Sequence, residues 1–434
     1  MIQGNIILRC PDLDRYELTM PGYQSKSDPL GALRISEFRH LVAGRLLFIM
    51  GLRMMSTLVG WWVYNLTNAP FAIGIVGLSE FVPAVSFALY AGHVIDLSEK
   101  KRLLLTGILL YLSSSLCLLF LSSNFISLRI QNHFIALGIY AIIFCTGIIR
   151  AFTGPVFNVI LAQIVPKSIL QNATTWSQGT FLTASVCGHA SAGFLIAGVG
   201  NTGTLVVIAA VMLASFVTLL QLKNKPPLNI RGQKNTWESV REGLQFVFRT
   251  KELLGAMSLD LFAVLFGGAA AMIPVFARDI LKVGAKGFGF LNSSSDFGSI
   301  LIVILLTFFP FRRKQGRILF FAVAGFGICI IIFGLSKLFW LSFAALMLSG
   351  MLDGVSVVTR GTIMQLKTPD QVRGRVLSVN SMFINSSNEL GQFESGVAAK
   401  LFGVIPSVVF GGVMTILVTA ITWYKAPSLR KMEY

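Results

Sequence analysis

Charged residues are scarce in this chain. Of its 434 residues, 13% are Asp, Glu, Lys or Arg, while 54% are hydrophobic. Soluble domains carry about 25% charged residues, so this composition argues against a chain of soluble domains. The apolar residues come in runs of about 20, the length that a helix needs to cross about 30 Å of hydrocarbon. The sequence therefore predicts an all-α membrane protein with many spans.

Other features are missing as well, and each absence narrows the function. No Gly-x4-Gly-Lys-Ser/Thr motif occurs, so the sequence gives no sign of a nucleotide site that could supply energy by hydrolysis. The five cysteines show no Cys-x2-Cys spacing, and we expect small buried residues, with no metal and no cofactor. The four histidines are scattered, which argues against an enzyme. Residues 1–37 contain no apolar core of a cleavable signal peptide.

Acidic residues are few, with 19 Asp and Glu against 36 Lys and Arg, for a net charge of +17. A nucleic-acid partner is not expected, because no basic helix carries interleaved aromatic residues in a polar context. Most of the Lys and Arg instead fall in alternate loops and in the tails. This asymmetry is typical of cytoplasmic loops, so we expect both termini in the cytoplasm.

The longest polar break in the chain, residues 223–252, separates six apolar spans from six others. Pro226-Pro227 ends the sixth helix, and Asn235-x-x-Glu238 begins an amphipathic helix that we expect on the cytoplasmic membrane surface. The expected parts are a cytoplasmic tail at 1–37, a six-helix bundle at 38–222, the linker at 223–252, a second six-helix bundle at 253–424 and a tail at 425–434.

The two halves repeat at a shift of 203 residues. The matched residues are Gly147 with Gly350, Pro166 with Pro369, Gly188 with Gly391, Gly193 with Gly396, and Gly200 with Gly403. The repeat predicts 12 transmembrane helices in two pseudo-symmetric six-helix bundles. At the same shift Arg150 falls on Asp353. We expect these opposite charges to face each other across a central cavity, as a pair that forms in one access state and breaks in the other.

Ionisable residues inside spans are costly and are functional candidates by default. The candidate substrate and coupling residues are Arg53, Glu80, Arg150, Asp260, Asp353, Glu389 and Glu394. The acids are candidate proton carriers, and the two arginines are candidate ligands for an anionic substrate. Arg53 lies deep in its span, so it faces either a polar cavity or a carboxylate partner, and the cavity is favoured. His189 is more simply a hydrogen-bonded packing residue than a proton carrier.

A polar loop follows the second span. It reads from Gly92 through Asp96 to Lys100-Lys101-Arg102. Glycine lets two helices approach closely, Asp96 suits a helix N-terminus or a cation, and the three cations hold the loop in the cytoplasm. The loop is either a topology anchor alone or an interhelical latch, and the spacing favours the latch.

This loop resembles the loop 2–3 signature of the major facilitator superfamily, G-x3-D-R-x-G-R-R/K, with Leu97 and Glu99 in place of the usual Arg and Gly. Arg150-x3-Gly154 resembles the span-4 motif of that superfamily, whose arginine is linked to proton coupling or substrate binding, and Pro155 should bend this helix. Residues 274–281, 360–375 and 388–396 resemble a bacterial branch that includes the enterobactin exporter. The resemblance extends from about Leu33 to Lys431.

The resemblance implies a major facilitator fold in the bacterial inner membrane. It also implies a secondary active transporter that works by alternating access, as a proton-coupled exporter of a siderophore or an amphipathic small molecule. We expect a monomer whose partners are the small-molecule substrate, protons and the lipid bilayer. An importer of a small solute with the same fold is one alternative. A non-transporting membrane receptor or scaffold is the alternative from a different class.

Overall fold

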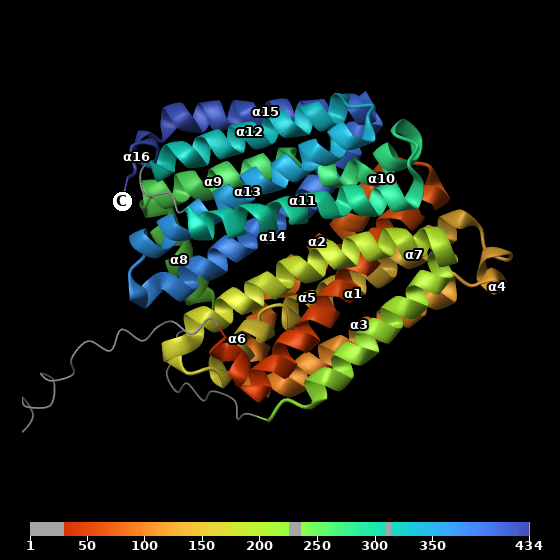
Figure 1. Ribbon diagram of the computed structural model, residues 1–434, viewed down its shortest axis with the longest axis horizontal. Coiled ribbons are helices and arrows are strands. Elements are labelled where there is room, and N and C mark those ends of the chain that lie inside the picture. The colour runs from red at the N-terminus through yellow and green to blue at the C-terminus, as the bar shows by residue number, and fades with distance from the viewer. Residues whose placement is uncertain (1–29, 225–235, 310–313, 434) are drawn as a thin grey trace, which may run out of the picture.

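A computed structural model gives the fold and describes residues 30–224, 236–309 and 314–433 (Figure 1). Every regular element in this part of the chain is a helix, as predicted. Figure 1 shows the long helices in two groups, with α1–α7 below and α9–α15 above.

The first group is the N-terminal bundle. Its helices are α1 (Ser36–Thr67), α2 (Pro70–Leu97), α3 (Lys100–Leu121), α4 (Asn124–Ser127), α5 (Asn132–Thr153), α6 (Val156–Ile164) and α7 (Leu170–Leu220), with short 3-10 turns η1 (Ala32–Arg34) and η2 (Lys167–Ile169). Pro155 stands between α5 and α6, where the ring of proline interrupts the helical ladder. The helix is therefore divided at the proline where the bend was predicted, while the backbone of Gly154 and Pro155 stays in the αR region.

The second group is the C-terminal bundle, preceded by the linker helix α8. Its elements are α8 (Thr236–Arg249), α9 (Lys251–Phe266), η3 (Ala269–Met272), α10 (Ile273–Val275), the π-helical turn η4 (Phe276–Ile280), α11 (Gly284–Phe308), α12 (Gln315–Leu335), α13 (Phe339–Lys367), α14 (Asp370–Phe402), α15 (Val404–Lys425) and α16 (Pro427–Arg430). Pro274 and Pro427 each lie in a first helical turn, where a missing N–H costs nothing.

Ten helices of the described chain are long and apolar enough to cross a membrane. The predicted number of twelve is reached in two ways. The 51-residue α7 holds two spans, which meet at Gly200 with a φ of 70°. The 33-residue α14 is not among the ten because it is rich in Asn, Ser and charged residues, yet it packs along α2 and α9 like the other long helices.

The pseudo-symmetry is visible in matched backbone contacts. A Cβ atom on Gly147 of α5 would overlap the carbonyl oxygen of Glu80 on α2. A Cβ atom on Gly350 of α13 would overlap the carbonyl oxygen of Ser295 on α11. The two glycines are related by the 203-residue shift, so each bundle uses the same close helix pair.

The bundles touch each other directly where two pairs of glycines face one another. A Cβ atom on Gly193 of α7 would lie 2.6 Å from the Cα of Gly289 on α11, and one on Gly396 of α14 would lie 2.9 Å from the Cα of Gly74 on α2. Gly74 and Gly289 lie near the starts of their helices, at the end of the molecule remote from α8. No side chain separates the backbones there, so this end is tightly closed.

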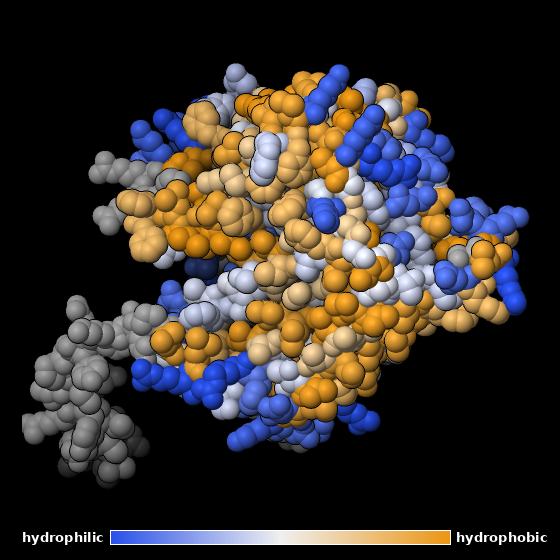
Figure 2. Space-filling view, turned by 45° about the vertical axis from the view of Figure 1, so that its right-hand side comes forward, coloured by the Kyte–Doolittle hydropathy of each residue, from blue (hydrophilic) through white to orange (hydrophobic). Residues whose placement is uncertain are grey.

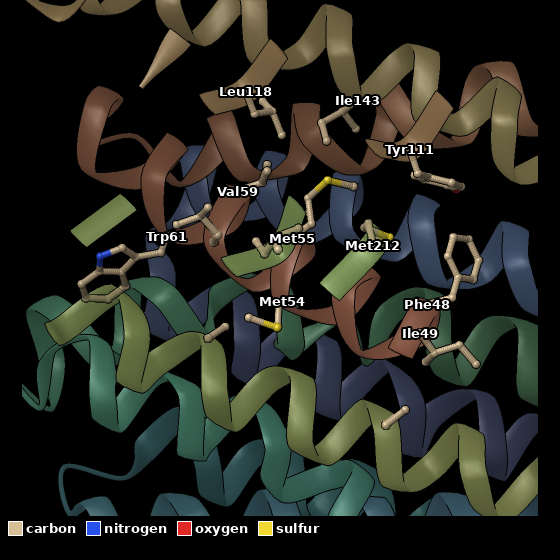
Figure 3. Close-up of a cluster of buried hydrophobic side chains, with 14 of the residues drawn as sticks. Phe48, Ile49, Met54, Met55, Val59, Trp61, Tyr111, Leu118, Ile143 and Met212 are labelled. Atoms are coloured by element: carbon tan, nitrogen blue, oxygen red, sulfur yellow. The ribbon is translucent and has the colours of Figure 1, made fainter. Parts of the chain in front are cut away.

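The apolar core runs through the same closed end. Figure 3 shows α1 side chains such as Met55 among Ile143 of α5 and Met212 of α7, which places α1 inside the N-terminal bundle. Trp61 of α1 stacks on Phe288 of α11 with 5.3 Å between ring centroids. The core of the first bundle therefore continues into the second at this end.

The opposite end is open on part of its surface, although α2 contacts α8 there. Figure 2 shows the surface hollowed between the bundles on the left, the end at which α8 and α16 lie in Figure 1. A molecule that is closed at one end and hollowed at the other has the shape of one access state of a two-bundle transporter.

The linker helix α8 packs on the C-terminal bundle. Glu242 pairs with Arg375 of α14, and a Cβ atom on Gly243 would lie 2.9 Å from the carbonyl oxygen of Arg375. Val247 is fully buried in the core of this bundle. The amphipathic helix expected after Asn235 is α8, and it directs this apolar residue toward protein.

Candidate functional site

An ion triad joins the two bundles at the last turn of α5, midway along α2 and α14. Arg150 of α5 lies 2.6 Å from a carboxylate oxygen of Glu80 on α2, and 2.7 Å from one of Glu389 on α14. The first pair lies inside the N-terminal bundle, and the second crosses to the C-terminal bundle. Three of the seven predicted residues therefore come together in one site.

The local sequence explains how Arg150 reaches Glu80. Gly147 lets α5 approach α2 at the level of Glu80, and Arg150 follows one helical turn later. Pro83 lies inside α2 just beyond Glu80 and removes one backbone N–H donor there. The carboxylate is thus presented at a close, irregular helix crossing.

The triad carries one more negative than positive charge. Glu389 is nearly enclosed, with 9% of its side chain exposed, whereas the side chains of Arg150 and Glu80 are 36% and 29% exposed. Gln392 also donates to the second oxygen of Glu389 at 3.3 Å. Because two carboxylates share one guanidinium, one of the carboxylates can take up a proton, and this would neutralise the extra negative charge.

A second polar cluster joins the bundles through α11. His189 of α7 lies 2.6 Å from the Thr57 hydroxyl and 3.1 Å from the Asn292 amide through Nδ1, and 3.7 Å from Asp296 through Nε2. Ser185 donates to the same carboxylate at 2.5 Å. His189 is therefore hydrogen bonded as predicted, and its neighbours come from both bundles.

Sequence reasoning did not select Thr57, Asn292 or Asp296 as site residues. Asp296 is acidic and lies in a predicted span, and Asn292 precedes it by one helical turn on α11. Polar residues four apart share a helix face, so this spacing was the available signal.

Arg53 lies near the second cluster without a carboxylate partner in the described chain. Its guanidinium stands over the ring of Phe181 at 5.4 Å, and the Thr57 hydroxyl binds its backbone carbonyl. The Cβ atom of Arg53 packs against Gly188 of α7, where a side chain in place of the glycine would overlap it. The ion-pair interpretation is not seen in the described chain, and the polar cavity expected around Arg53 stays a prediction.

Asp260 and Asp353 lie together inside the C-terminal bundle. Asp260 forms an ion pair with Arg360, whose Nε donates to Ser356 at 3.2 Å. Asp353 lines a small cavity with Asp260 and Ser356. The expected pairing of Arg150 with Asp353 is not the one seen, because the carboxylates on Arg150 come from α2 and α14.

Glu394 lies on α14 beyond the triad and is half-buried. The described chain gives it no cationic partner. It therefore stays apart from the ion triad, although it is on the same helix as Glu389.

The predicted latch is only partly described. Gly92 and Asp96 fall in the last turns of α2, where their side chains lie outside the described part of the structure. Lys100 is buried and turns back to the α2 C-terminus, where its ammonium donates to the carbonyls of Ile95 and Ser98. A cation on the last carbonyls stabilises a helix end. Lys101 is half-buried and Arg102 is exposed.

The closed end carries polar contacts as well. Arg278 of η4 donates to Asn65 at 2.9 Å and to Asn68, and its guanidinium lies 4.7 Å over the ring of Tyr64. The Tyr64 hydroxyl donates to Asp279. These contacts join the end of α1 to the end of the seventh span, so they reinforce the glycine contacts between the bundles.

Comparison with known proteins agrees with this architecture. The family model described as "transmembrane secretion effector" matches residues 27–434. The chain belongs to this family of the major facilitator superfamily. Its relatives include an uncharacterized MFS-type transporter, YfmI, of Bacillus subtilis, which is 21% identical over 68% of this chain and 73% of the relative.

Two further proteins show the breadth of the likeness. The enterobactin exporter EntS of Shigella boydii is 22% identical over 78% of this chain and 79% of its own length. The crystal structure of a point mutant of the nucleoside transporter NupG superposes with a TM-score of 0.72 at 13% identity, over 89% of this chain and 99% of that one. The chain is thus a multi-pass secondary transporter of the major facilitator type and not an enzyme.

Proposed function

We propose that this protein is a proton-coupled exporter of an anionic, amphipathic small molecule of the siderophore class. It acts as a monomer in the bacterial inner membrane, with both termini in the cytoplasm. The observation that carries the proposal is the ion triad, because it unites a proton-accepting excess charge with a bond between the two bundles. The likeness to the enterobactin exporter supports the direction and the substrate class.

The bundles, residues 38–222 and 253–424, rock against each other about the linker 223–252 in this proposal. The hollow at the α8 end then opens to the cytoplasm, since the basic loops lie at that end. Substrate enters from the cytoplasm and meets Arg53, whose guanidinium has no carboxylate partner in the described chain. Arginine can bind a carboxylate or catecholate oxygen with two N–H groups, and Phe181 supplies an apolar face.

The triad couples this movement to protons. With Glu80 and Glu389 both ionised, Arg150 holds α14 to α5. A proton on Glu389 removes its charge and weakens the bond that crosses between the bundles. Proton uptake from one side and release to the other can thus alternate with movement of the substrate.

Transport in inverted membrane vesicles tests direction and coupling. Vesicles that contain the protein and have an acidic lumen should accumulate a radiolabelled catecholate siderophore in the lumen, and a protonophore should abolish this. Accumulation only by right-side-out vesicles would replace the exporter with the importer. Absence of flux for catecholate and hydroxamate siderophores and for amphipathic dyes would contradict the substrate class.

A matched pair of variants tests the role of Arg53. Loss of a hydrogen bond to a charged group costs about 1.5–3 kcal/mol, so Arg53→Gln should raise the KM for the anion about 10- to 100-fold. Arg249→Gln removes the same charge from an exposed position on α8 and should leave KM unchanged. An equal KM in both variants would show that Arg53 does not contact the substrate.

A further inference from the structure

A second cleft lies on the outer side of the C-terminal bundle, away from the ion triad. It encloses about 410 Å³ and is lined by Arg317 and Phe321 of α12, Trp423 of α15, Arg430 of α16 and Lys431. Three of its five lining residues are cations, and the other two are aromatic. Neither the substrate path nor the latch uses any of them.

The end of the chain is folded to build this cleft. The Gly316 N–H donates to the carbonyl of Met432 at 3.3 Å, and a Cβ atom on Gly316 would overlap the carbonyl oxygen of Leu429. Leu429 is fully buried in the core of the C-terminal bundle. The last turn is therefore docked under α12, which holds Arg430 and Lys431 on the side of Arg317.

Within residues 30–224, 236–309 and 314–433, no acidic side chain offsets the charges in the cleft. Its lining contains no acidic residue, and the described chain gives Arg317, Arg430 and Lys431 no ion pair. Glu433 is exposed and is not part of the lining. The guanidinium of Arg430 lies 5.1 Å from the centroid of the Trp423 ring, a cation–π contact that places this charge beside the aromatic wall of the cleft. The three positive side chains repel one another when they are held close together, so binding of an anion between them is favourable.

The aromatic residues indicate where that anion comes from. Trp423 lies in the last turn of its membrane-spanning helix, the depth at which tryptophan meets lipid headgroups. Phe321 lies one turn into the membrane from Arg317 and is 68% exposed on the outside of the bundle. An acyl chain has an apolar surface beside Phe321, while a headgroup reaches the cations at the helix ends.

We propose that this cleft binds the phosphate headgroup of an anionic phospholipid in the cytoplasmic leaflet. The assignment of the leaflet rests on the orientation proposed above, and the site is independent of what the protein transports. Basic pockets between helices on the cytoplasmic side are suited to such headgroups, because that leaflet is negatively charged. Two arginines supply N–H groups to the phosphate oxygens, and Lys431 adds a third positive charge.

Electron paramagnetic resonance with spin-labelled lipids tests the site. The full-length protein is placed in phosphatidylcholine nanodiscs, and immobilised spin-labelled phosphatidylglycerol is compared with spin-labelled phosphatidylcholine. Each of Arg317→Gln, Arg430→Gln and Lys431→Gln should lower the preference for phosphatidylglycerol about five-fold, and the triple variant about a hundred-fold. The matched control combines Arg241→Gln, Arg249→Gln and Lys251→Gln, which removes three exposed cations at the same end of the molecule.

The outcomes separate the possible sources of phosphate. The proposal holds if the control triple keeps the preference, the cleft triple loses it, and millimolar inorganic phosphate or glycerol 3-phosphate leaves the bound lipid in place. It is overturned if the cleft triple binds phosphatidylglycerol like the wild type, or if both triples lose it equally. Displacement by inorganic phosphate also overturns it, because the cleft then binds a soluble phosphate compound. Thermal unfolding in phosphatidylcholine nanodiscs shows that each variant is folded.

Discussion

Replacing Glu389 by glutamine should shift the protein away from the access state described above. The change keeps the shape of the side chain but removes the charge that crosses from α14 to Arg150. Glu80 still neutralises Arg150, so the roughly 3–5 kcal/mol cost of an orphaned buried charge is not reached. What remains is the loss of a charge-assisted hydrogen bond, about 2 kcal/mol. If the bond exists in this state alone, the population ratio of the two states changes about 30-fold.

Electron–electron distance measurements can follow this shift. Spin labels at Gln131 and Lys337, on a background without native cysteines, mark the two bundles at their closed end, where both residues are exposed. Opening of that end lengthens the distance between the labels. Glu389→Gln should populate a longer distance that is rare in the wild type.

Glu80→Gln is a closely matched control. This variant also removes one glutamate carboxylate from the same nitrogen of Arg150. The ion pair that it breaks, however, lies inside the N-terminal bundle. The distance distribution should therefore stay close to that of the wild type. Equal shifts in both variants, or a shift in neither, would refute the view that the bond across the bundles holds this state.

Two further variants probe the closed end with the same pair of labels. A Cβ atom at position 193 would lie 2.6 Å from the Cα of Gly289, so the side chain of Gly193→Val would overlap α11. The closed arrangement should lose about 1–3 kcal/mol of stability, and this end should open. An unchanged distance would mean that the two backbones separate without cost. Arg278→Gln removes the hydrogen bonds to Asn65 and Asn68, but these are partly exposed, so the shift should be under about five-fold. A larger shift would make Arg278 the main fastening of this end.

Glycine made the architecture predictable from sequence. Where two helix backbones touch, no other residue fits, so the 203-residue spacing of Gly147 and Gly350 records two equivalent contacts. The same reasoning holds at Gly200 and Gly403, whose φ angles of 70° and 90° mark matched breaks between consecutive spans. Requirements of this kind depend on one residue type and are therefore visible in a single chain.

The partners of the buried charges were harder to predict. A repeat compares equivalent positions, so it linked Arg150 to Asp353, its counterpart in the other bundle. Residues that occupy equivalent positions in a repeat need not touch each other. The residue that does contact Arg150 is Glu389, which is 239 residues away in the sequence. Its approach depends on how the bundles dock, which no local pattern records. Arg360 was missed because its partner Asp260 lies on another helix of the same bundle, and the sequence does not record how these two helices pack.

The polarity of α14 also concerns how the protein enters the membrane. A helix that carries Glu389, Glu394 and many amide and hydroxyl groups does not partition alone into hydrocarbon, since each ionised residue near the centre costs about 2.5–3.5 kcal/mol. Its neighbours α2 and α9 are both synthesised before it. They supply the backbone contact at Gly74, and α2 positions Glu80 on the arginine that Glu389 joins. Insertion of α14 is therefore an assembly step, in which the finished N-terminal bundle receives the last polar surface of the transport path.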